Sequence, residues 1–189
     1  MKKIIKSNIP VIGLAAYSGT GKTSLLINLI PLLKEYGLEV GVIKHAHHTF
    51  EIDQAGKDSY KIRKAGASQM LIGSKERWAL MVDQKETNQT MRLQEYITLL
   101  DHTKLDLILV EGFKPESIPK IELYRPSLGH PLICKSDDSV VAIATDAEIT
   151  EELNLTVLDL NDHAAIMHFI IKNFFTKNNT IIKTHQNTL

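Results

Sequence analysis

Residues 11–23 read V-I-G-L-A-A-Y-S-G-T-G-K-T, and this stretch decides the fold. Its first part, Val11 to Ala15, is a short apolar run without alternation, as is typical of a strand buried on both faces of a parallel sheet. Ala16 to Thr23 then matches the phosphate-loop pattern G-x-x-x-x-G-K-S/T, except that alanine replaces the first glycine. Residues 22–36 place leucines at helical spacing and stop before Gly37. Strand, glycine-rich loop and helix in this order predict a phosphate-binding loop.

Each part of this loop has a chemical reason. Gly19 and Gly21 let the backbone turn so that successive N–H groups point at phosphate oxygens, and the following helix adds its positive dipole end. The ammonium group of Lys22 would bridge the β- and γ-phosphates, and the hydroxyl of Thr23 would be a ligand of Mg²⁺, so these two are the candidate catalytic residues. The predicted nucleotide-binding residues of the loop are Ser18, Gly19, Thr20, Gly21, Lys22, Thr23 and Ser24.

The rest of the chain alternates between strand and helix patterns. Further strands are predicted at residues 39–43, 105–110, 121–124, 140–144 and 156–160, and further helices at 58–65, 91–100 and 162–175. Ser68–Ile72 and Arg77–Val82 flank G-S-K-E and predict a β-hairpin. We therefore expect an α/β fold of the P-loop NTPase type, with a mostly parallel central sheet flanked by helices. Residues 1–175 would form one domain with a hairpin inserted at about 68–83, followed by a flexible polar tail over residues 176–189.

Composition limits the partners. Lysine plus arginine number 22 and aspartate plus glutamate number 22, so no global field attracts nucleic acid or an anionic membrane, and anion recognition must be local. The single cysteine, Cys134, cannot form an internal disulfide, which fits a reducing compartment. Lys6 and Pro10 interrupt the apolar N-terminal stretch, and no apolar run approaches the roughly 20 residues that span a bilayer. We expect a cytoplasmic protein without nucleic-acid or membrane partners.

Two acidic residues follow apolar strands on the edge where ligands of such sheets bind. A phosphate loop needs a carboxylate at the end of a neighbouring strand to hold Mg²⁺, and Glu111 directly follows L-I-L-V, so Glu111 and Thr23 are the predicted metal ligands. Asp146 follows V-V-A-I-A-T and could accept hydrogen bonds from a guanine edge. Because no N-K-x-D motif occurs, C-K-S-D-D at residues 134–138 is an alternative to Asp146.

Lys44-His45-Ala46-His47-His48 come directly after the second predicted strand. Three imidazoles in four residues can bind a transition metal, whereas the simpler interpretation is a solvated polar loop. Since this loop leaves the sheet at the same edge as the phosphate loop, we expect it to contribute to ligand binding.

Four segments together resemble the molybdopterin-guanine dinucleotide biosynthesis protein B (MobB) family. In order and spacing they cover roughly residues 9–125. They are G-L-A-A-Y-S-G-T-G-K-T-S-L at 13–25, I-K-H-A-H-H-T-F-E-I-D at 43–53, G-K-D-S-Y-K-I-R-K-A-G-A at 56–67 and D-L-I-L-V-E-G-F-K at 106–114. Members of the family usually open the phosphate loop with glycine, and Ala16 departs from this pattern.

The resemblance implies a GTP-binding protein with weak, Mg²⁺-dependent GTPase activity. Such a protein assists the guanylyltransferase that joins GMP to molybdopterin in molybdenum-cofactor synthesis. The resemblance also implies a homodimer that shares a β-hairpin, for which Gln69 to Val82 is the candidate. Lys44, His45, His47 and His48 would line the mouth of the nucleotide site. A second polar patch, suited to a phosphate-bearing pterin or to a signalling contact, would comprise Asp53, Lys57, Asp58 and Ser59.

Two other functions fit the same motifs. Nucleotide binding could switch an adapter whose turnover is incidental, or the histidine loop could make the protein a metallochaperone GTPase. A small-molecule kinase would need an acceptor base and an arginine-rich lid, and the sequence indicates neither. No arginine is identified as a charge-stabilising finger either, so efficient hydrolysis is expected to require a partner.

Overall fold

The computed structural model describes residues 5–46, 50–83 and 91–175. The chain forms two compact units, one made of residues 1–45 with 92–189 and the other of residues 46–91. We call the first, which contains the phosphate loop, the core unit, and the second, which contains the hairpin, the inserted unit. The predicted tail at 176–189 lies outside the described residues, as do His47 and His48.

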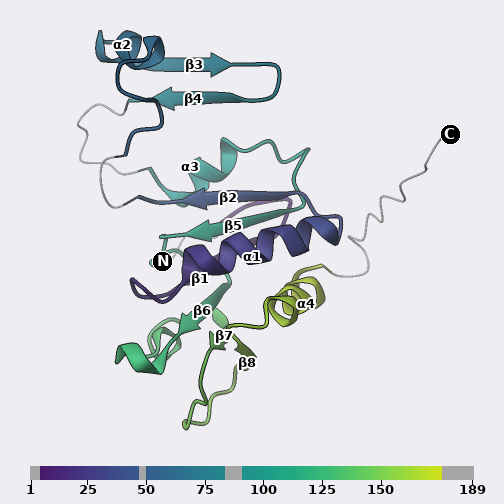
Figure 1. Ribbon diagram of the computed structural model, residues 1–189. Helices are drawn as coiled ribbons and strands as arrows, with labels where there is room; N and C mark the ends of the chain where they lie inside the picture. Colours follow the sequence, from purple (N-terminus) through teal and green to yellow (C-terminus); the bar gives the residue numbers. More distant parts are fainter. Residues whose placement is uncertain (1–4, 47–49, 84–90, 176–189) are drawn as a thin grey trace, which may run out of the picture. The chain divides into compact units, whose positions relative to one another are not determined.

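A six-stranded parallel sheet forms the centre of the core unit (Figure 1). Its strands are β1 (Val11–Ala15), β2 (Val40–Lys44), β5 (Leu107–Glu111), β6 (Lys120–Tyr124), β7 (Val140–Thr145) and β8 (Thr156–Asp159). They are ordered β2-β5-β1-β6-β7-β8, so the strand that feeds the phosphate loop lies between β5 and β6. All pairs are parallel, which confirms the predicted α/β fold of the P-loop NTPase type.

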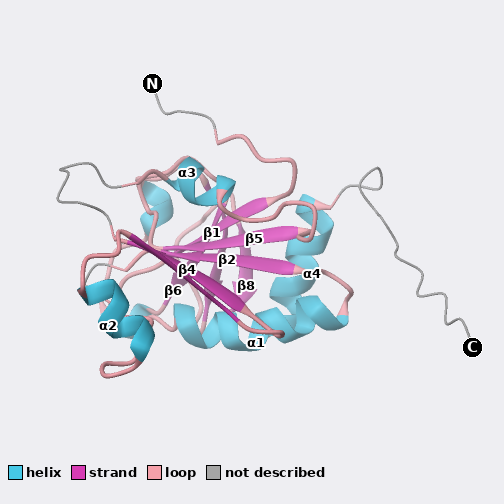
Figure 2. Ribbon diagram, turned by 90° about the horizontal axis from the view of Figure 1, so that it is seen from above, coloured by secondary structure: helices cyan, strands magenta, loops and turns pink. Residues whose placement is uncertain are grey.

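Helices cover both faces of this sheet (Figure 2). The helices α1 (Lys22–Glu35) and α4 (His163–Phe174) pack on one face, where they bury Ile12, Leu109 and Leu29. The short helix α3 (Leu93–Thr98) packs on the other face against Ile108 and neighbouring side chains. Consecutive residues of β1 and β5 alternate between these two cores, which explains why their sequences are apolar throughout. Their burial holds the loop between β1 and α1 on a rigid base.

The inserted unit contains α2 (Asp58–Lys64) and an antiparallel hairpin of β3 (Gln69–Gly73) and β4 (Trp78–Val82). Arg63, whose side chain is 8% exposed, pairs with the carboxylates of Glu51, Asp53 and Asp83. This cluster ties the segment before α2 to the end of β4. The unit is therefore larger than the hairpin insertion at about 68–83 that the sequence indicated.

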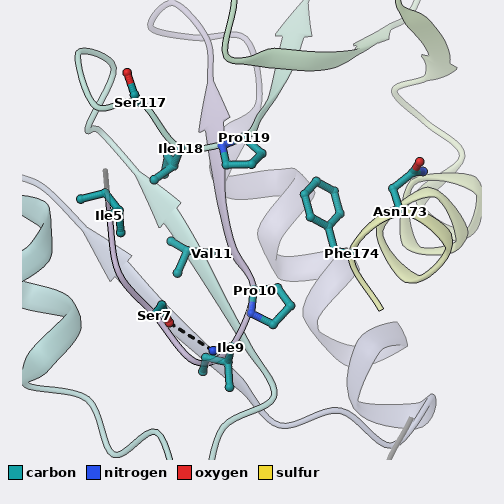
Figure 3. A pocket seen from close by; sticks show the side chains of 10 residues that line it. All are labelled: Ile5, Ser7, Ile9, Pro10, Val11, Ser117, Ile118, Pro119, Asn173 and Phe174. Atoms are coloured by element: carbon teal, nitrogen blue, oxygen red, sulfur yellow. Dashed lines mark hydrogen bonds between the residues drawn. The ribbon is translucent and has the colours of Figure 1, made fainter. Parts of the chain in front are cut away.

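A cavity of about 480 Å³ opens at the amino end of the sheet (Figure 3). Residues before β1, residues before β6 and the end of α4 line it, and most of these side chains are apolar. The phosphate loop leaves β1 at the opposite end, after Ala15. This cavity is therefore not the predicted phosphate site. In the described parts of the chain, no helix has both the length and the apolar character needed to cross a membrane.

Candidate functional site

The carboxyl ends of the parallel strands bring distant residues to one edge of the sheet. Lys44 at the end of β2 lies in register with Glu111 at the end of β5, and Glu111 is also paired with Leu14 of β1. On the other side of β1, Ala15 is in register with Glu122 of β6. Open α/β sheets bind ligands at this edge, so these strand ends and the loop after β1 form the candidate site.

The backbone of the phosphate loop has the turns that its sequence predicts. Gly19 and Gly21 have φ values of +79° and +107°, which favour glycine, and α1 begins directly after Gly21. Every described residue with positive φ is a glycine, so Ala16 adopts an ordinary conformation and its side chain is buried. Its replacement of the usual glycine is therefore free of backbone strain. Thr20 is also buried, and its hydroxyl donates to the carbonyl of Tyr17 at 2.9 Å.

Lys22 folds back over the phosphate loop. Its Nζ donates to the carbonyl oxygens of Tyr17 at 3.0 Å and Ala16 at 3.3 Å, which holds the ammonium group across the loop. Burial lowers the pKa of Lys22; the carboxylate of Glu111 opposes this shift, and the charge of Lys114 adds to it. Lysine charges therefore gather around one acidic side chain, as expected if a neutral protein concentrates its positive field at a single site.

Glu111 is held by an ion pair. Lys44 Nζ donates to Glu111 Oε2 at 2.9 Å, and the Glu111 side chain is only 11% exposed. The next residue, Gly112, has a φ of +95° and lies so close to His45 that a Cβ would be 3.0 Å from the carbonyl oxygen of His45. The His45 N–H donates to the Glu111 carbonyl at 2.9 Å, and its ring meets that of Phe113 edge-on at 5.2 Å. The structure thus brings Lys44, His45 and Glu111 together at the ends of β2 and β5.

The donor set suits Mg²⁺. Hard divalent cations prefer carboxylate and hydroxyl oxygens, which Glu111 and the exposed Thr23 supply near a phosphate loop. Lys44 occupies Oε2 of Glu111, so a metal ion would compete with this ammonium group or use the other oxygen. Among the described residues, no group of three or more His, Cys, Asp or Glu side chains is arranged so that it could hold a metal ion.

Asp146 lies at the predicted edge, but its carboxylate is paired with Arg125, the residue that follows β6. Arg125 in turn contacts the phosphate loop, since its Nε donates to the Thr20 carbonyl at 2.9 Å. The alternative segment at 134–138 has a structural role: Asp137 accepts from the buried ammonium group of Lys120 at 2.7 Å. Sequence reasoning missed Arg125, although its position directly after a strand at the ligand-binding edge was a usable signal.

The second predicted polar patch belongs to the inserted unit. Asp53 is only 5% exposed and is bound to Arg63, whose hydrogen bonds lower the pKa of this carboxyl group. Lys57 precedes α2 at its N-cap position, and Asp58 is the first helical residue and is almost fully exposed. Ser59 follows within the same helix. These four residues are thus in a different unit from the phosphate loop.

Comparison with known proteins identifies the family. The sequence profile described as "Molybdopterin guanine dinucleotide synthesis protein B" (MobB) matches residues 11–146, which include the phosphate loop, Glu111 and Asp146. The chain belongs to the MobB family. This confirms the resemblance seen in the four sequence segments.

Relatives from several organisms agree. The chain is 45% identical over 168 residues to the molybdopterin-guanine dinucleotide biosynthesis adapter protein of Escherichia coli K12, covering 88% of this chain and 94% of the relative. It is 43% identical to the protein of the same description from Haemophilus influenzae, covering 88% and 90%. The crystal structure of Bacillus subtilis MobB superimposes with a TM-score of 0.67 at 23% identity, covering 87% of this chain and 97% of that chain. This last likeness concerns the fold.

Proposed function

We propose that this protein is a GTP-binding adapter in the synthesis of molybdopterin guanine dinucleotide. The observation that carries the proposal is a phosphate loop with both glycine turns and Lys22 in place, in a chain of the MobB family. The most similar relatives described above are named as adapters of this pathway. The guanylyltransferase that attaches GMP to molybdopterin is the proposed partner, and molybdopterin itself is a possible second ligand.

The described residues have distinct roles in this proposal. The backbone N–H groups of residues 18–24 and the start of α1 bind the phosphates, and Lys22 supplies a positive charge across the loop. Thr23 and Glu111 bind Mg²⁺, which neutralises part of the triphosphate charge. Hydrolysis is expected to be slow, because the roles proposed for the described residues are phosphate binding, charge stabilisation and Mg²⁺ binding, and none of these residues is assigned as a base that activates water.

Calorimetric titration of the full chain with GTP, ATP and GDP, with and without Mg²⁺, tests nucleotide binding. Wild-type protein is expected to bind GTP in a Mg²⁺-dependent manner, and Lys22→Ala to lose at least about tenfold in affinity. Lys34→Ala is the matched control, since it removes an exposed lysine from the last turn of the same helix. Tight binding of ATP without binding of GTP would reject the guanine preference, and no binding of any triphosphate would reject the whole proposal.

The adapter role is separable from turnover. If nucleotide occupancy switches the adapter, stimulation of a guanylyltransferase is lost in Lys22→Ala. Stimulation that survives the loss of nucleotide binding would show that the nucleotide does not control the partner. The comparison uses Lys22→Ala and Lys34→Ala, and the second variant controls for any effect of a substitution in α1 on folding.

We further propose that the hairpin joins two copies of the chain. Its register places Leu71, Trp78, Leu80 and Val82 on one face, and these side chains are between 47% and 71% exposed. Met81, on the opposite face, is buried. An isolated two-stranded hairpin with one large apolar face is marginally stable in water, so this face needs a cover.

Light scattering after size exclusion tests the dimer. Leu71→Lys combined with Leu80→Lys places like charges directly opposite each other on the exposed face and is expected to give a monomer. Glu76→Lys, which makes the net charge more positive by the same amount at an exposed position near the hairpin turn, is the control. A double-lysine variant that remains a dimer would rule out this face as the interface.

A further inference from the structure

The segment that follows β6 contacts the phosphate loop at two points. Arg125 binds the Thr20 carbonyl through Nε at 2.9 Å. Five residues later, the ring of His130 stacks on Tyr17 with centroids 4.3 Å apart and an interplanar angle of 17°. Residues 125–130 therefore contact the phosphate loop at both ends of this short stretch.

A buried carboxylate of β6 holds the residues that follow His130. The carboxylate of Glu122, which is 1% exposed, accepts the N–H groups of Ile133 at 2.7 Å and Cys134 at 2.8 Å. A buried carboxylate with two backbone donors restricts the segment strongly, because releasing it would leave a buried charge without partners. The Glu122 side chain thus anchors residues 133 and 134 to β6, the strand that Arg125 directly follows.

The guanidinium group of Arg125 connects two elements of the site. Nη1 pairs with the carboxylate of Asp146 at the end of β7, while Nη2 lies 3.7 Å from the point that a Cβ of Gly21 would occupy. An arginine has five N–H donors, and within the described residues the structure assigns two of them, to Thr20 and Asp146. The side chain is 31% exposed, so solvent and ligands can reach it.

The charges around the phosphate loop are compatible with a further cation that binds phosphate. Lys44 and Lys114 both act on the charge of Lys22, and Lys44 pairs with Glu111 at the end of β5, one neighbour of β1. Arg125 approaches from the opposite neighbour, β6, beside the glycine that precedes α1. A planar guanidinium group matches two phosphate oxygens at once, and a polyphosphate carries more negative charge than one lysine and Mg²⁺ neutralise.

We propose that Arg125 is a phosphate-binding residue of the nucleotide site, and that Asp146 is the positioning residue that holds its guanidinium group. This inference rests on the proposed binding of a nucleoside triphosphate. The nucleotide and Asp146 compete for the same guanidinium group. Removal of the Asp146 charge therefore strengthens nucleotide binding, whereas removal of Arg125 weakens it.

Titration calorimetry of full-length variants with Mg²⁺ and GTP, GDP or ATP tests this competition. Arg125→Ala is expected to lose about tenfold to a hundredfold in affinity for all three nucleotides, and Arg125→Lys to lose less. Asp146→Asn is expected to bind all three about two- to fivefold more tightly, as suits a partly exposed ion pair. The matched controls are Lys135→Ala and Glu151→Gln, which remove an exposed ion pair elsewhere in the core unit and are expected to bind like the wild type.

The opposite outcomes overturn the inference in distinguishable ways. If Asp146→Asn weakens GTP binding but leaves ATP binding unchanged, Asp146 reads the guanine base. If Asp146→Asn and Arg125→Lys lower the melting temperature while nucleotide affinity is unchanged, the pair is only a structural clamp. Wild-type protein that binds no nucleotide would instead reject the proposed function itself, before the variants are compared.

Discussion

Replacement of Gly112 by alanine tests the geometry of the strand ends that hold Glu111. Gly112 has a φ of +95°, and an alanine in this left-handed conformation costs about 1–2 kcal/mol. Its Cβ would also lie 3.0 Å from both Cβ and the carbonyl oxygen of His45, so the ends of β2 and β5 would have to separate. This movement strains the hydrogen bond from the His45 N–H to the Glu111 carbonyl, which is worth about 1 kcal/mol. We therefore expect Gly112→Ala to lower the free energy of unfolding by about 2–3 kcal/mol.

Gly37→Ala provides the matched control for the backbone conformation. Gly37 has the same φ of +95°, but no atom lies within 4 Å of its added Cβ. Urea denaturation of both variants separates the cost of the left-handed conformation, which they share, from the contact with His45, which only Gly112→Ala makes. We also expect only Gly112→Ala to weaken Mg²⁺-dependent nucleotide binding, because Glu111 is the adjacent residue. Equal destabilisation by the two variants would refute the reasoning.

Three further variants examine other parts of the core unit. Ala16→Gly should leave GTP affinity unchanged within about twofold, because Ala16 needs no left-handed conformation. The same change should lower the free energy of unfolding by about 0.5–1 kcal/mol, because glycine loses more backbone freedom on folding. A large gain in GTP affinity, measured by calorimetry, would contradict this reasoning. Lys44→Met removes the ion-pair partner of Glu111. A titration of Mg²⁺ at fixed GTP should then require about two- to fivefold less metal. An unchanged requirement would show that Lys44 does not compete with Mg²⁺ for Glu111. Burial disfavours the charge of Asp137, but hydrogen bonds, first that from Lys120, outweigh it and lower the pKa. Its stabilising contribution is therefore present above the ordinary carboxyl pKa of about 4 and is lost as the pH falls through the lowered value. Asp137→Asn should lower the free energy of unfolding by about 3 kcal/mol at pH 7, because it leaves the buried ammonium group of Lys120 without its carboxylate partner. It should also make the free energy of unfolding depend less on pH in the acid range. An unaltered pH dependence in urea titrations would argue against this role of Asp137.

Local patterns in the sequence predict the elements that carry the site. The apolar run of β1, the two glycines and the leucine spacing of α1 are each determined within a few residues, and each is present in the structure. Asp162 also acts locally, since its side chain caps α4 by accepting the Ala165 N–H at 2.8 Å. Glu111 could be placed at the correct edge because a buried parallel strand ends directly before it.

Contacts between side chains of distant elements cannot be predicted from such local patterns. The contact of Arg125 with the phosphate loop depends on the placement of β6 beside β1, across 105 positions of sequence. The pairing of Lys44 with Glu111 depends likewise on the register of β2 against β5. Asp53 was predicted to belong to a second polar patch, and its ion pair with Arg63 could not be predicted from the sequence pattern. Side-chain partners of this kind follow from tertiary arrangement, which single-sequence reasoning does not supply.

The charges around the loop form a connected set. Two carboxylates at strand ends beside the loop each pair with a cation, Glu111 with Lys44 on the β5 side and Asp146 with Arg125 on the β6 side. If the protein binds a triphosphate with Mg²⁺, as we propose, the metal can replace Lys44 at Glu111, and the phosphates can bind the released ammonium group of Lys44 and the guanidinium group of Arg125. We then expect metal and nucleotide to strengthen each other's binding, because each provides a partner for a charge that the other displaces. Paired charges of this kind allow a chain of zero formal net charge to carry a strongly charged site.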